Sequence, residues 1–138
     1  MRVLGLDLGS KRIGVAVSDS SGTIAGPLTV LQRTGDHARD HENIRKLVVE
    51  EEAERVVVGL PLSLDGSMGP AAMAAVAEAE QLATVVGVPV ESYDERLTTV
   101  SAERTLMQAK MRAEARRRVV DKVAAAVMLQ AWLDGRSR

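Results

Sequence analysis

The sequence predicts an α/β fold in which helices cover both faces of a five-stranded mixed sheet. Three β-rich runs joined by short connections open the chain, which is typical of an antiparallel meander. A nearly continuous apolar run at 55–60 (RVVVGL) is typical of a parallel strand that is buried on both faces. Helical and strand patterns then alternate, as they do in βαβ units. The expected order is therefore β-β-β-α-β-α-β-α-α.

The first two strands lie within residues 1–19 (MRVLGLDLGSKRIGVAVSD). Two apolar runs flank a tight polar break at 9–12, which predicts a β-hairpin. Period-two alternation places Asp7 on the same face as Val3, in a strand that is expected to be buried. A third strand is expected at 23–31, where Pro27 indicates a sheet edge or a bulge.

The remaining elements follow from helical spacing and from capping residues. Ile44, Leu47 and Val48 repeat at helical spacing. Pro70 and Gly87 are suited to begin and end a helix, in which Met73 is expected to face the core. The expected elements are helices at 37–54, 70–87, 98–110 and 119–133 and a fifth strand at 88–93.

Composition excludes several classes of protein. A chain of 138 residues is long enough to bury a core, and we expect one domain, 1–138. Aromatic residues make up 1% of the chain, which argues against stacking platforms for single-stranded nucleic acid. There is no Cys, which excludes thiolate chemistry. No signal-peptide pattern or membrane-length apolar run is evident, so we expect a cytoplasmic protein.

Asp7 is the first candidate functional residue. A carboxylate in a buried strand is costly unless a cation, a hydrogen bond or an ion pair compensates it. Closure of the following turn through local hydrogen bonds would explain it equally well. An ion pair with Lys11 or Arg12 is a further alternative.

Three other acidic residues occupy informative places. Asp94 and Glu95 follow the fifth strand, at the end of the sheet where sites gather in α/β proteins. They also suit a solvated turn with Arg96 as countercharge. Asp121 lies on an apolar, small-residue face of the last expected helix, although an acid is also favoured in a helix's first turn by the dipole.

If strands one and five are near neighbours, Asp7, Glu95 and Asp121 can converge. Like charges so close need a cation, and carboxylates select Mg²⁺ or Mn²⁺ over zinc. Two such ions can activate water and stabilise the leaving oxygen of a phosphodiester. Covalent catalysis is disfavoured, because the chain has no Cys and because His37 and His41 are expected to be solvated.

Basic residues adjoin each acid. The segment 110–122 carries six Lys or Arg residues against Glu114 and Asp121, a local net charge of +4. Such a run suits a phosphate backbone, although it also suits a solvated face that offsets the acids at 50–54. The net charge of −1 requires any nucleic-acid contact to come from such local patches. The candidate phosphate contacts are Lys11, Arg12, Arg96, Arg116, Arg117 and Arg118.

Four segments together resemble the YqgF (RuvX) family. They are DLGSKRIGVAVSD at 7–19, GLPLSLDGSMGP at 59–70, DERLTT at 94–99 and DKVAAAVMLQAWL at 121–133. The family comprises RNase H-like proteins described as Holliday-junction resolvases and as pre-16S rRNA processing nucleases. The resemblance implies an RNase H-like fold and a metal-dependent nuclease site. The family's acids carry over to Asp7, Glu95 and Asp121, and Asp94 stands beside Glu95 in the motif.

The sequence therefore predicts a Mg²⁺-dependent nuclease acting on structured nucleic acid, either precursor 16S rRNA or a Holliday junction. In this hypothesis Asp7 bridges two metals, and Glu95 and Asp121 each complete one metal's shell. Expected partners are nucleic acid and ribosomal particles, with the chain a monomer or a homodimer. The alternative is a non-catalytic nucleic-acid or ribosome-associated module of the same fold. An ATPase is disfavoured because the related phosphate loops need two such domains.

Overall fold

The structure is a computed structural model that describes residues 1–63, 65–97 and 113–136, with the side chains of 97 and 113–119 excepted. Its strands are β1 (Val3–Leu8), β2 (Arg12–Ser18), β3 (Ala25–Gln32), β4 (Arg55–Leu60) and β5 (Val90–Asp94). Its helices are α1 (His37–Glu50), α2 (Pro70–Ala83) and α4 (Ala113–Arg136), with a 3₁₀ turn, η1 (Glu95–Leu97). The helix expected at 98–110 lies outside the described residues.

The five strands form one mixed sheet in the order β3-β2-β1-β4-β5, which confirms the predicted architecture. β2 pairs antiparallel with β1 and with β3. β4 pairs parallel with β1 and with β5. The meander and the βαβ units therefore share β1 as the central strand, and β1 carries Asp7 near its carboxyl end.

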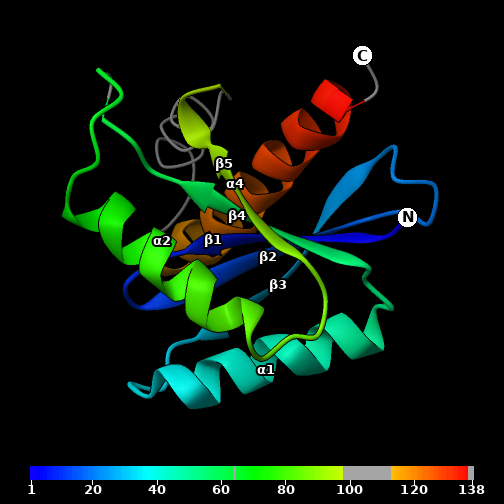
Figure 1. The fold of residues 1–138 in the computed structure, drawn as a ribbon, viewed down its shortest axis with the longest axis horizontal. Coiled ribbons are helices and arrows are strands. Elements are labelled where there is room, and N and C mark those ends of the chain that lie inside the picture. The colour runs from blue at the N-terminus through cyan, green and yellow to red at the C-terminus, as the bar shows by residue number, and fades with distance from the viewer. Residues whose placement is uncertain (64, 98–112, 137–138) are drawn as a thin grey trace.

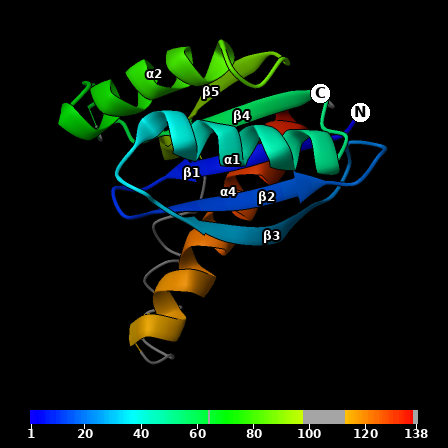
Figure 2. The same ribbon diagram turned by 90° about the horizontal axis from the view of Figure 1, so that it is seen from below.

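Helices cover both faces of the sheet, as predicted. Figures 1 and 2 show α1 and α2 on one face and α4 on the other. Alternation along β1 separates two apolar cores, because Leu4 and Leu6 pack with α1 and α2, whereas Val3 packs with Met128 and Leu129 of α4. Asp7 has the same parity as Val3 and therefore lies on the α4 face.

Several elements end differently from the sequence prediction. α1 ends at Glu50 rather than at residue 54, because Glu51 caps it and Glu52 adopts a left-handed backbone with φ of 54°. α2 ends at Ala83 rather than at residue 87. The edge strand β3 shows the irregularity expected at its proline: the register shifts between Val15 and Ala16, opposite Pro27.

Within the described part of the chain, no helix combines the length and the hydropathy that crossing a membrane requires.

Candidate active site at the carboxyl end of β1

Asp7 lies between two glycines on the neighbouring strands. Its partner in β2 is Gly14. On the other side Leu6 pairs with Val58 of β4, so the next residue, Gly59, is level with Asp7. Residues level with each other on adjacent strands share a face, and the strands are about 4.8 Å apart. The half-buried Asp7 side chain therefore has no β2 or β4 side chain directly beside it on the α4 face.

The other two predicted acids cover these glycines. A Cβ added to Gly14 would come within 3.0 Å of the backbone oxygen of Asp121, closer than real Cβ atoms approach. A Cβ added to Gly59 would lie 2.5 Å from Oε1 of Glu95. The α4 backbone at Asp121 and the carboxylate of Glu95 thus approach the sheet on the two sides of Asp7. The structure brings the three positions to one region.

The carboxylate of Asp121 is paired in this structure with Arg12, the first residue of β2. Arg12 donates from Nε to Oδ2 of Asp121 at 2.8 Å, and the two side chains are 23% and 21% exposed. This contact joins residues that are 109 positions apart in the sequence. Lys11, in the turn between β1 and β2, is exposed.

Arg96 is held beside the site by its neighbour Asp94. Its guanidinium donates to both carboxylate oxygens of Asp94 at 2.6–3.1 Å, and these hydrogen bonds lower the pKa of Asp94. A Cβ added to Gly66 would lie 3.2 Å from Nη1 of Arg96, so the loop after β4 rests against this guanidinium. Arg96 is thus the countercharge of a surface turn in this conformation.

The three consecutive arginines 116–118 belong to the first turns of α4. Figure 2 shows these turns extending past the sheet beyond β3. Their side chains lie outside the described residues, so their contact with phosphate stays a prediction.

The donor set of Asp7, Glu95 and Asp121 consists of carboxylate oxygens alone, which suits a hard divalent cation such as Mg²⁺ or Mn²⁺. As they lie in this structure, the three acids do not form a set of close metal-ligand atoms, whereas another set among the described residues does. That set is His37, His41 and Glu78, whose ligand atoms lie within 4.8 Å of one another. It belongs to the opposite face of the sheet.

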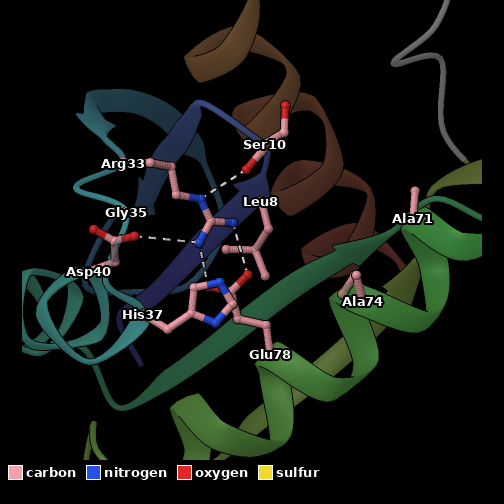
Figure 3. A pocket seen from close by; sticks show the side chains of 11 residues that line it. Leu8, Ser10, Arg33, Gly35, His37, Asp40, Ala71, Ala74 and Glu78 are labelled. Atoms are coloured by element: carbon pink, nitrogen blue, oxygen red, sulfur yellow. Dashed lines mark hydrogen bonds and ion pairs between the residues drawn. The ribbon is translucent and has the colours of Figure 1, made fainter.

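A second polar cluster lines a cavity of about 340 Å³ on the α1 and α2 side (Figure 3). Arg33, the first residue after β3, donates to both oxygens of Glu78 at 2.6 and 2.8 Å. His41 contacts Glu78 at 2.8 Å. The expectation that both histidines are solvated is wrong for His41, which is 2% exposed because α2 covers it, and right for His37.

Sequence reasoning missed Arg33, Glu78 and the two glycines. A signal for the glycines was present, because Gly inside a strand often marks a close backbone approach. The sequence around Arg33 and Glu78 gave no comparable signal, because their pairing depends on how α2 packs against the sheet.

We expect the charge of Glu78 to make the fold sensitive to acid. Burial by itself raises the pKa of Glu78, but hydrogen bonds from Arg33 and His41 outweigh it and hold that pKa below its ordinary value of 4.5. The stabilisation from the ionised Glu78 carboxylate is therefore present above pH 4.5, and it is lost as the pH falls through the lowered pKa. Urea unfolding between pH 3 and 7 checks this: Glu78→Gln should show a smaller loss of stability below about pH 4.5 than wild type. Equal losses in the two proteins would contradict it.

The sequence profile described as "RuvX: Holliday junction resolvase" matches residues 1–135. The chain belongs to the RuvX family. Among curated RuvX relatives, one from Myxococcus xanthus is 50% identical over 134 residues, covering 97% of this chain and 88% of the relative. One from Syntrophomonas wolfei is 44% identical over 137 residues, covering 99% and 96%. Both carry the name "Putative pre-16S rRNA nuclease".

Solved structures share the fold of this RuvX-family chain. RuvC of Thermus thermophilus in complex with a Holliday junction substrate aligns with a TM-score of 0.60 at 18% identity, covering 99% of this chain and 96% of that one. The yeast mitochondrial Holliday junction resolvase Ydc2 aligns with a TM-score of 0.56 at 12% identity, covering 98% and 78%. At these identities the likeness concerns the fold, which is the RNase H-like fold expected from the sequence.

Proposed function

We propose that this RuvX-family chain is a metal-dependent nuclease that hydrolyses phosphodiester bonds in structured nucleic acid, with precursor 16S rRNA as its substrate. The observation that carries the proposal is the pair of glycines beside Asp7, over which Glu95 and Asp121 are placed. The absence of a Cβ at Gly14 and Gly59 leaves room beside Asp7 for the α4 backbone at Asp121 and for the carboxylate of Glu95, which supports grouping the three acids in one site. The names of relatives at 44% and 50% identity support the choice of substrate.

In this proposal Asp7, Glu95 and Asp121 would hold Mg²⁺ or Mn²⁺. A divalent cation bound there would supply an activated water and stabilise the leaving oxygen. Asp7 lies between the positions that Glu95 and Asp121 approach, so it would be the central ligand of the set. Arg12 holds the carboxylate of Asp121 through the 2.8 Å contact from its Nε.

The basic residues divide into two groups by their present partners. Arg12 and Arg96 are paired with Asp121 and Asp94, so contact with a phosphate would require them to share or exchange these partners. Lys11 is exposed at the turn next to Asp7. We assign the first phosphate contacts to Lys11 and to arginines 116–118, where α4 extends past the sheet.

Holliday-junction resolution is the second candidate, and the description of the matching family favours it. Symmetric cleavage of a four-way junction needs two sites, which two copies of this chain would supply as a homodimer. Action on rRNA precursors would instead place a monomer or a dimer on ribosomal particles in the cytoplasm.

Cleavage assays separate these functions. We expect the purified chain to cut an end-labelled 16S rRNA precursor in Mg²⁺ or Mn²⁺, at a rate at least about 100-fold above that in EDTA, because the acids need the cation to act. A synthetic four-way junction in parallel tests the second candidate. Cleavage that persists in EDTA would contradict the metal site, and tight binding of both substrates without cleavage would favour the non-catalytic module.

A further inference from the structure

The turn that follows Asp7 is held from the opposite face of the sheet by Arg33. Arg33 donates from Nε to the carbonyl oxygen of Gly9 at 2.9 Å. Its backbone N–H donates to the carbonyl oxygen of Lys11 at 2.9 Å, and Gly9 N–H donates to the carbonyl oxygen of Arg12 at 2.9 Å. Arg33 alone therefore donates hydrogen bonds to two carbonyl oxygens of the turn that joins Asp7 to Arg12.

Arg33 is itself fixed by buried acids. Its two terminal nitrogens bind the two oxygens of Glu78, and Asp40 Oδ2 lies 3.7 Å from Nη1. Glu78 in turn contacts His41 (Figure 3 shows Arg33 between Glu78 and Asp40). The side chains of Arg33 and Glu78 are 12% and 6% exposed. A two-pronged guanidinium–carboxylate contact fixes direction as well as distance, so Arg33 has little freedom to leave Gly9.

This cluster is poorly suited to bind an ion. The set His37, His41 and Glu78 has the spacing of a metal site, but both oxygens of Glu78 already accept hydrogen bonds from the Arg33 guanidinium. An added cation would lie next to that positive charge. An added anion would face Asp40 and Glu78, with Nε, Nη1 and Nη2 of Arg33 already donating to other groups.

Stability alone is a weak reason for such a cluster. Buried ion pairs lose much of their attraction to desolvation, and apolar side chains of similar volume often replace them without loss. What an apolar residue cannot do is bind the carbonyl of Gly9 in a fixed direction. The geometry therefore points to control of the turn.

We propose that Arg33 is a positioning residue for the nuclease site: held by Glu78 and His41, it fixes the turn 9–11 and through it the places of Asp7 and of Arg12, which binds Asp121. This inference rests on the proposed function. Catalysis depends on placement to within about 1 Å, so a looser turn lowers turnover without altering residues that touch nucleic acid.

The test compares Arg33→Met and Arg33→Lys with wild type and with Ile44→Val. Ile44 is buried in α1 and belongs to the apolar core between the sheet and helices α1 and α2. Ile44→Val therefore perturbs packing on this face while leaving every contact of Arg33 in place. Hydrogen exchange of the Gly9 amide reports the turn directly, and single-turnover and steady-state cleavage give kcat and KM.

We expect both Arg33 variants to exchange the Gly9 amide at least tenfold faster, and to lose at least tenfold in kcat with KM for the substrate within twofold of wild type. Lys retains the charge but cannot bind Glu78 and Gly9 together, so it should not rescue. Ile44→Val should keep kcat and the exchange of Gly9 near wild type.

The proposal is overturned if the Arg33 variants retain wild-type Gly9 exchange, or if Ile44→Val reproduces their effects. If Arg33→Met does not fold, Arg33→Lys and Glu78→Gln, which removes the charge that holds Arg33, carry the same comparison. Failure of the proposed function has a different signature, because wild type would then cleave nothing while Gly9 exchange still separated the variants.

Discussion

Asp7→Asn should abolish metal-dependent cleavage and leave the fold intact. The amide replaces a charged ligand of a hard cation with a neutral one, at the position between Glu95 and Asp121. We expect the single-turnover rate to fall at least about 1,000-fold, which corresponds to about 4 kcal/mol of transition-state stabilisation. Urea unfolding should change by less than about 1 kcal/mol, because Asn has the same shape and the residue is half-buried at the end of a strand.

Asp134→Asn is the matched control for this experiment. Asp134 is exposed near the end of α4, where it accepts a hydrogen bond from Gln130. The same chemical change there should leave the cleavage rate within about twofold of wild type. Normal cleavage by Asp7→Asn, measured on protein with a wild-type unfolding curve, would remove Asp7 from the mechanism.

The sheet could be predicted from the sequence because its signals are local. Residues 56–60 (VVVGL) carry no polar side chain because β4 is covered on both faces, and Pro27 marks β3 as an edge. The alternation that places Asp7 on the face of Val3 needs only the neighbouring residues. The order of the strands and the place of the last helix then bring Glu95 to Gly59 and the backbone of Asp121 to Gly14, on the two sides of Asp7.

The cluster on the other face could not be predicted in the same way. Helix α2 is rich in alanine, so its periodicity leaves the buried face ambiguous, and Met73, which was expected inside, is 61% exposed. The true inner face carries Ala72, Ala75 and Glu78. Whether a Glu on that face is buried depends on Arg33, which lies 45 positions away. The pairing of Arg12 with Asp121 is non-local for the same reason.

Gly14→Ala should lower the free energy of unfolding more than the same change at Gly26, the other sheet glycine that we compare. The added Cβ would lie within 3.0 Å of the backbone oxygen of Asp121, and a backbone atom cannot rotate aside as a side chain can. Helix α4 or strand β2 must therefore shift, and overpacking of this kind costs about 1–3 kcal/mol. Urea unfolding measures the loss, and cleavage under conditions where the variant is folded measures the effect on the site.

Gly26→Ala provides the comparison, because Gly26 lies in the adjacent strand β3 and a Cβ there meets nothing within 4 Å. Both variants restrict the unfolded chain alike, a gain of about 0.4–1 kcal/mol in each, so the difference between them isolates the clash with α4. We expect Gly26→Ala to retain wild-type cleavage and Gly14→Ala to lose cleavage even when fully folded, since the shift of α4 carries Asp121 away from Asp7. Equal stability of the two variants would show that α4 does not approach β2 this closely, and the glycine beside Asp7 would then have no part in assembling the acids.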